Sequence, residues 1–437
     1  MSGVVRFAVK ALVGLVALQV VFFVLLMGAQ AVPNGPIIKH LAQAIQTGDY
    51  GAPYGPDGVG GTADRFTECA ELGYGVTTPD DPRSLWNLTT GGPRLSSCDD
   101  GKGEIQRLAA GEDFQTPATY FRYWSGYSVL TRPVLALTDV PGLRLVVTGV
   151  FAAAVLAAFL AVTRRLGAVA GFALFLPIAA TTNALAMPDR AFTHGIALAT
   201  VAAGVAVTAV AASRGWRAAV LGAGFSAALF CYTDLLTVPP MAWALCAAVA
   251  AAVTHARTRN PRETWRTVLA VGAAWPIAFG FTWVFRWFIG ALGQGLSVFS
   301  RVQEVSQFRL DGGDVSHAFG AGVVANWTYW TQHSVTAVPV VVASTVLLAV
   351  LVALTLARHG VRGLATFAAV ALPALVVPAW YCVLSNHSQI HAFFVYRSLP
   401  AAVGVLLLAG VVACRRFRHA LPDHAEATAV GEVPLRS

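Results

Sequence analysis

The sequence predicts an all-α integral membrane protein with about ten transmembrane helices and a large extracytoplasmic loop after the first of them. Of the 437 residues, 56% are hydrophobic and only 12% are charged, whereas a soluble domain carries about 25% charged residues. Apolar runs of about 20 residues recur along the chain, and each is long enough to cross a bilayer as a helix. This composition excludes an ordinary soluble protein and a disordered chain.

The first apolar run covers residues 11–32 and follows Arg6 and Lys10. Its end, Ala29-Gln30-Ala31, also has the small-x-small pattern of a signal-peptide cleavage site. We expect a retained helix, because a cytoplasmic N-terminus agrees with the charges of the later connections. Nine further apolar runs are predicted to cross the membrane: 143–162, 166–187, 193–212, 218–236, 238–254, 268–289, 337–356, 364–384 and 398–413.

Arginines at every second connection predict the orientation of these helices. They are Arg164, Arg165, Arg214, Arg217, Arg257, Arg259, Arg262, Arg266, Arg358, Arg362, Arg415, Arg416 and Arg418. Because short cytoplasmic loops are rich in Lys and Arg, we expect a multi-pass protein of the cell membrane with both termini in the cytoplasm. The net charge of +8 has the same origin and does not indicate nucleic-acid binding.

This orientation divides the chain into four parts. They are a first transmembrane helix (1–32), an extracytoplasmic loop domain (33–141), a multi-helix transmembrane domain (142–414) with a second outer loop at 290–336, and a cytoplasmic tail (415–437). Cys69 and Cys98 share the loop domain. Outside the cytoplasm the two can form a disulfide, but their spacing leaves a disulfide and two free thiols equally open.

Acidic residues in the loop domain are candidates for catalysis. In the stretch 62–69, a helix would place Asp64 and Glu68 on one face, four residues apart. A carboxylate held above the membrane can act as a general base toward a sugar hydroxyl. The alternative is a solvated helix face without a catalytic role.

An arginine within an aromatic run, just before the second predicted helix, is a candidate phosphate ligand. Arg122 is followed by Tyr123 and Trp124. Arginine suits bidentate recognition of phosphate, and aromatic rings stack on sugars. An arginine and aromatic belt at the lipid headgroups explains the same residues equally well.

Two histidines follow the ninth apolar run. His387 and His391 are four residues apart, so that a helix would place both on one face, and Arg397 lies shortly after them. This spacing permits a divalent metal, but it lacks the intervening acid of the metalloprotease motif. Substrate contacts or interfacial histidines without a function are the alternatives.

The shorter outer connections carry further ionisable residues. Asp189 and Arg190, with His194 close behind, lie between the third and fourth runs, and Asp234 lies where the fifth run ends. An ionisable residue beside an apolar stretch is a candidate functional residue, although Asp234 can equally be a cap or a turn. Because such residues gather on one side of the predicted membrane, we expect a site at its outer interface.

Three stretches look like those of bacterial multi-pass proteins associated with cell-envelope glycans: Tyr-Trp-x-Gly-Tyr at 123–127, Tyr-x-Asp-Leu-Leu-Thr at 232–237 and Asn-His-Ser-x-Ile-His at 386–391. The topology, with many apolar runs and a large outer loop after the first, resembles the GT-C class of integral membrane glycosyltransferases. The resemblance implies many transmembrane helices and an acidic catalytic residue in the first outer loop, here Asp64 with Glu68 as a second candidate. It also implies a polyprenyl-phosphate sugar as donor and an envelope glycan as acceptor.

Three other functions remain open on the sequence. The first is a transporter or flippase of a lipid-linked envelope precursor, which would use polar residues near the midplane. The second is a membrane O-acyltransferase, for which His387 or His391 would be catalytic. The third is an envelope scaffold without catalysis.

Overall fold

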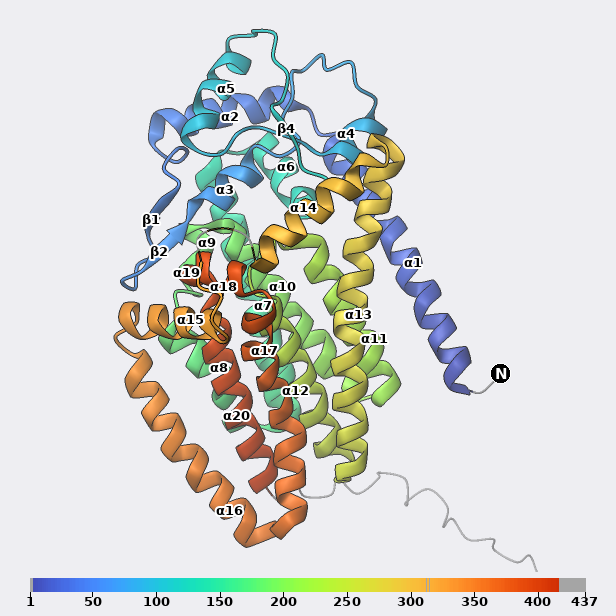
Figure 1. The fold of residues 1–437 in the computed structure, drawn as a ribbon, viewed down its shortest axis with the longest axis vertical. Coiled ribbons are helices and arrows are strands. Elements are labelled where there is room, and N and C mark those ends of the chain that lie inside the picture. Colours follow the sequence, from blue (N-terminus) through green and yellow to red (C-terminus); the bar gives the residue numbers. More distant parts are fainter. Residues whose placement is uncertain (1–2, 312, 314, 416–437) are drawn as a thin grey trace, which may run out of the picture.

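The computed structural model describes residues 3–311, 313 and 315–415. Long helices form a bundle that is capped at one end by residues 31–139, which we call the loop layer (Figure 1). Within the described residues, seven helical stretches are long and apolar enough to cross a membrane. The protein is therefore an all-α, multi-pass membrane protein. From residue 416 on, the predicted tail 415–437 lies outside the described residues.

The bundle has two buried helices at its centre. It consists of α1 (Gly3–Gln30), α7 (Val140–Leu166), α8 (Ala168–Thr181), α10 (Phe192–Ala212), α11 (Trp216–Thr233), α12 (Pro239–Thr258), α13 (Pro261–Gln294), α16 (Ala337–Ala371) and α20 (Ser398–Cys414). Most side chains of α10 and α12 are buried. Both helices are rich in small residues, which let neighbouring backbones approach closely inside a membrane.

Two helices lie at the periphery of the bundle. α1 and the first limb of α16 splay away from it on opposite sides (Figure 1), and most of their side chains are exposed. α16 bends at Gly360, whose φ of 59° and ψ of −148° suit glycine alone. The bend separates the two runs predicted at 337–356 and 364–384, and the second limb continues through η1 (Leu372–Leu375) and α17 (Val376–Val383).

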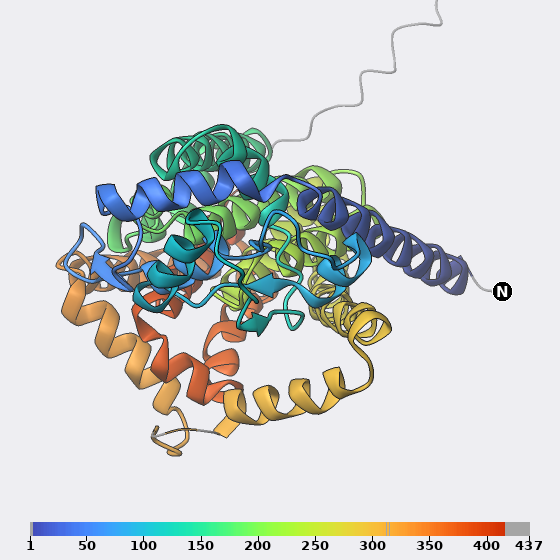
Figure 2. The same ribbon diagram turned by 90° about the horizontal axis from the view of Figure 1, so that it is seen from above.

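The loop layer is made of short helices and two small antiparallel hairpins. Its elements are α2 (Asn34–Thr47), β1 (Tyr54–Pro56), β2 (Thr62–Asp64), α3 (Arg65–Leu72), α4 (Leu85–Gly91), β3 (Pro93–Arg94), α5 (Asp99–Ala109), β4 (Ala118–Thr119) and α6 (Ser128–Leu137). β1 pairs with β2, and β3 pairs with β4. Seen from above, α2 lies across the end of the bundle (Figure 2), with Ile37, Ile38 and Leu41 buried beneath it.

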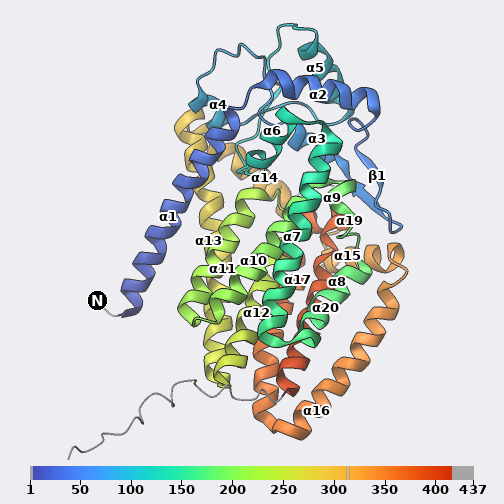
Figure 3. The same cartoon turned by 180° about the vertical axis from the view of Figure 1, so that it is seen from behind.

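A disulfide and several short helices complete this end of the molecule. Cys69 of α3 is bonded to Cys98, which directly precedes α5. The connection predicted as a second loop at 290–336 forms α14 (Ser297–Asp311) and α15 (Ala321–His333). With α9 (Met187–Arg190), α18 (Ser385–Ile390) and α19 (Ala392–Val395), they lie at the end of the bundle that carries the loop layer (Figures 1 and 3).

Candidate functional site

Asp64 is buried where the loop layer meets the bundle. It ends β2 and caps α3, because its carboxylate accepts hydrogen bonds from the backbone N–H of Thr67 at 3.1 Å and from the Thr67 hydroxyl at 2.5 Å. Its other close neighbour is His194, whose Nε2 is 3.1 Å from Oδ2. Burial raises the pKa of Asp64, but the hydrogen bonds from His194 and Thr67 outweigh burial and hold it below its usual range. The carboxylate is therefore ionised at neutral pH.

Arg397 fixes the tautomer of His194, that is, which ring nitrogen carries the proton. The guanidinium of Arg397 is fully buried at the start of α20, and its Nη1 lies 3.0 Å from Nδ1 of His194. Arginine only donates, so Nδ1 must accept and the ring proton sits on Nε2, where it points at Asp64. Residues from the loop layer, α10 and α20 thus form one directed chain of hydrogen bonds, Arg397 to His194 to Asp64.

A second acid, Asp57, is joined to the same cluster. Its Oδ2 accepts from Nδ2 of Asn183 at 2.7 Å, and Oδ1 of Asn183 accepts from Nε of Arg397 at 2.6 Å. The other oxygen of Asp57 accepts from the backbone N–H groups of Val59 and Gly61. Asp57 therefore holds the turn between β1 and β2 in place, and this turn leads to Asp64.

Glu68 has a different environment from Asp64. Its Oε1 pairs with Arg144 at 2.6 Å, and its Oε2 accepts from the backbone N–H of Phe192 at 2.9 Å. Arg144 also pairs with Asp49 at 3.0 Å. Both oxygens of Glu68 are thus used to join α3, α7 and α10, and a structural role fits them better than proton transfer.

Arg122 and Tyr123 line a groove of about 190 Å³ near α14. Arg309 of α14 supplies a second guanidinium, and two tryptophans form part of the wall, Trp283 and Trp287. The remaining wall is largely aliphatic: Leu236, Val302, Val305, Leu310 and Leu384. The groove therefore combines two cations with an apolar lining. Trp124 is in the core instead, where its Nε1 donates to the carbonyl of Thr282.

The two predicted histidines meet at Arg309. Nη1 of Arg309 lies 3.0 Å from Nδ1 of His387 and 2.9 Å from Nε2 of His391. Burial, with the Arg309 charge nearby, lowers the pKa of His391 to about 4 and that of His387 well below its usual range. Both rings are therefore neutral and accept from Arg309. Within the described residues, no group of three or more His, Cys, Asp or Glu side chains could hold a metal.

Aromatic contacts connect this histidine pair to Asp64. The ring of His391 stacks on Phe394 at 5.1 Å, and the ring of Phe394 lies 4.9 Å from that of His194. The groove beside α14 and the Asp64 cluster are thus two neighbouring parts of one region.

The other predicted site residues lie apart from this hydrogen-bonded chain. Asp189 and Arg190 are exposed and pair with each other at 3.4 Å. Asp234 is buried at the end of α11 and accepts from the backbone N–H of Thr237 at 2.8 Å and from its hydroxyl. This is the turn that the sequence left open as an alternative. Burial raises the pKa of Asp234 to about 7.

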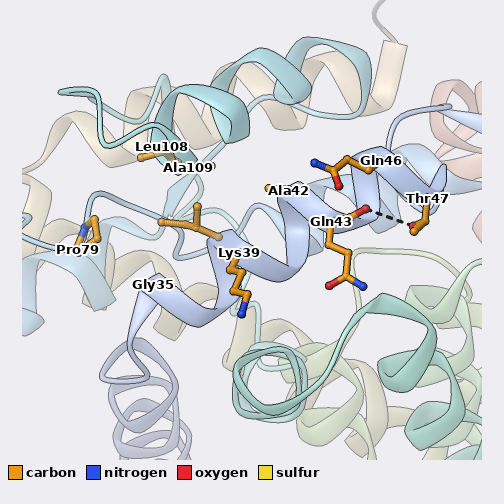
Figure 4. A pocket seen from close by; sticks show the side chains of 10 residues that line it. Gly35, Lys39, Ala42, Gln43, Gln46, Thr47, Pro79, Leu108 and Ala109 are labelled. Atoms are coloured by element: carbon orange, nitrogen blue, oxygen red, sulfur yellow. Dashed lines mark hydrogen bonds between the residues drawn. The ribbon is translucent and has the colours of Figure 1, made fainter.

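A groove of about 790 Å³ lies over α2 (Figure 4). Polar side chains along it include Lys39, Gln43, Gln46 and Thr47, and the Thr47 hydroxyl donates to the carbonyl of Gln43. The described residues of this groove include no carboxylate or imidazole. Its ionisable side chain among the described lining residues is Lys39, in contrast to the acids and histidines around Asp64.

Sequence reasoning missed several members of the cluster. Asp57, Asn183 and Arg309 were not among the candidates, and His194 was noted only as a neighbour of Arg190. The sequence offered one signal for Asp57, an acid directly before a glycine-rich turn.

Comparisons of the chain with protein-family models, curated proteins and solved structures find no match.

Proposed function

We propose that the protein is a glycosyltransferase that moves a sugar from a polyprenyl-phosphate donor to a cell-envelope glycan or glycolipid. The main support is the buried, ionised carboxylate of Asp64, which His194 and Arg397 orient at the loop-layer end of the bundle. In this proposal the loop layer faces the outside of the cell and both termini face the cytoplasm. The bundle crosses the cell membrane about ten times, with α16 counted as two limbs.

Asp64 would act on the acceptor hydroxyl. As the hydroxyl oxygen bonds to the anomeric carbon, its proton passes to the carboxylate. The bond from that carbon to the phosphate oxygen breaks, and the electron pair leaves with the phosphate. Two carboxylate oxygens offer about four acceptor positions, so the three contacts with Thr67 and His194 leave one position for the acceptor hydroxyl. A carboxylate of low pKa takes the proton late, once bond formation has made the hydroxyl acidic.

The groove beside α14 suits the lipid donor. Guanidinium groups pair well with phosphate, and Arg122 and Arg309 both line the groove. They would stabilise the charge that develops on the departing phosphate. Trp283, Trp287 and the aliphatic wall would accommodate the isoprenoid chain.

The two other activities have less support. An acyltransferase would need a histidine with a free lone pair, but Nδ1 of His387 and Nε2 of His391 both accept from Arg309. A flippase would not need a carboxylate oriented by a buried histidine and arginine.

The test is glycosyl-linkage analysis of the envelope in a deletion strain that is complemented with variants. Asp64→Asn keeps the size of the side chain but removes the charge, and we expect one linkage to stay missing although the protein is expressed normally. Arg397→Lys should reduce that linkage, because a lysine cannot reach His194 and Asn183 together. The matched control is Asp113→Asn, an exposed acid of the loop layer, which should restore the linkage. The proposal fails if Asp64→Asn restores it too, or if intact lipid-linked glycans accumulate.

A further inference from the structure

The end of the bundle remote from the loop layer has a pocket of about 430 Å³ with a basic lining. Three arginines and two histidines contribute to it: Arg259, Arg362, Arg415, His255 and His359. They come from the end of α12, the bend of α16 and the residue after α20, three places far apart in the sequence. The described lining includes no carboxylate, and the acid Glu263 pairs elsewhere, with Arg266 at 2.8 Å.

Two unusual backbone conformations bring these side chains together. Arg259 has a φ of 52°, in the left-handed region that non-glycine residues seldom adopt. Gly360 has a φ of 59° and lies between His359 and Arg362. Both residues turn the chain at the pocket, and these turns bring Arg259 and Arg362 to the same pocket wall.

Helix dipoles do not account for the whole cluster. Cations at the C-terminal ends of α12 and α20 are favourable without any ligand. Arg362, however, lies in the first turn after the bend of α16, where the helix N-terminus already carries positive partial charge. Within the described residues, neither Arg362 nor Arg259 has an ion-pair partner. Guanidinium groups that line one pocket repel one another, and a bound anion would offset this repulsion.

From this convergence we propose that the pocket binds a phosphate group, most directly the phosphate of an anionic phospholipid. Guanidinium forks match phosphate oxygens, and the lining of Ala413, Gly363 and Thr366 provides an uncharged wall. The pocket lies where the helices of the bundle end, which is where a headgroup of that leaflet would reach it. The site is separate from Asp64 and does not depend on the proposed function.

The test compares the full chain in phosphatidylcholine nanodiscs with and without phosphatidylglycerol, with retained lipids counted by native mass spectrometry. The variant is Arg259→Asn with Arg362→Gln, since asparagine tolerates the left-handed region. The control is Arg164→Gln with Arg214→Gln, two exposed arginines in the basic connections at the ends of α7 and α10. We expect wild type and control to retain phosphatidylglycerol about tenfold more tightly than the pocket variant.

Two further measurements keep the result decisive. Arg362→Lys keeps the positive charge and should retain binding. A pocket variant that loses binding because it fails to fold would show a lower thermal midpoint than wild type, so an unchanged midpoint assigns the loss to the pocket. Titration of inorganic phosphate in phosphatidylcholine nanodiscs identifies a soluble ligand. The proposal is supported if the pocket variant alone loses saturable binding of phosphatidylglycerol or of inorganic phosphate. It is overturned if the pocket variant and the control bind both probes equally.

Discussion

At the level of single residues, the candidate acid Asp64 is in contact with a buried histidine, His194, whose Nε2 lies 3.1 Å from its carboxylate. Asp64 was a candidate because it lies in a loop predicted to be outside the membrane. Its contact with His194 joins residues 130 positions apart, and no spacing rule reveals such a pair. Glu68 met the same criteria as Asp64, yet it is occupied by Arg144 and the backbone of Phe192. Only tertiary packing distinguishes the two acids.

Asp234 gives a prediction for the dependence of stability on pH. Its pKa is raised from 3.8 to about 7 by burial, so between these values the folded state holds a proton that the unfolded state has lost. The free energy of unfolding should therefore fall as pH rises from about 4 to 7, by at most about 1.4 kcal/mol per pH unit from this group. Thermal midpoints of wild type and Asp234→Asn across this range measure the effect.

Asp234→Asn should lose the part of the pH dependence of the unfolding free energy that comes from Asp234. The control Asp113→Asn should retain it. Burial raises the pKa of Glu71 as well, and the charge of Asp234 adds to this shift. Asp234→Asn therefore also loses the part of the Glu71 contribution that depends on Asp234, which has the same sign. Parallel curves for wild type and Asp234→Asn would contradict the assignment.

At the level of elements, hydropathy located the long helices because burial in lipid requires nearly continuous apolar sequence. It could not show that α16 is a single helix bent at Gly360. A break between two apolar runs does not tell at what angle the chain continues from one run into the next. The helices α14 and α15 were expected to be loop, because polar residues interrupt their apolar stretches. Their position is what brings Arg309 to His387 and His391.

The disulfide between Cys69 and Cys98 should stabilise the loop layer. It closes a loop of 29 residues between α3 and α5, and a crosslink of this kind contributes about 2–4 kcal/mol. We expect Cys69→Ser with Cys98→Ser to lower the thermal midpoint. A reducing agent should lower the midpoint of wild type toward that of the variant and leave the variant unchanged. An unaffected wild type would contradict this role.

At the level of the whole molecule, the charge pattern predicts which side each end occupies, and the structure adds which loops share an end. Residues of the loop layer, α9, α14, α15, α18 and α19 lie together at one end (Figures 1 and 3). The arginine-rich connections that end α7, α10 and α12 lie at the other. The grouping agrees with the positive-inside rule, which orients the bundle but says nothing of contacts within it.

Cysteine labelling in intact cells tests this orientation. Asp113→Cys, in the loop layer, should react with a membrane-impermeant maleimide from outside. Arg214→Cys, after α10, should react only once the membrane is permeabilised. Wild type supplies the background, to which half-buried Cys382 can contribute, whereas Cys231, Cys246 and Cys414 are buried. The reverse pattern would place the Asp64 site in the cytoplasm, where nucleotide sugars are available and a lipid-linked donor would lose its rationale.

The position of Arg397 has a consequence for biosynthesis. This residue directly precedes α20, the last helix that the structure describes, yet it donates to Asn183 and His194, which leave the ribosome some 200 residues earlier. Until α20 inserts, Nδ1 of His194 lacks the Arg397 donor that fixes its tautomer, and Asp64 is held by Thr67 alone. If Asp64 acts as the proposed function requires, a nascent chain would be inactive until α20 is in the bilayer, and a chain that terminates before Arg397 would be an inert membrane protein.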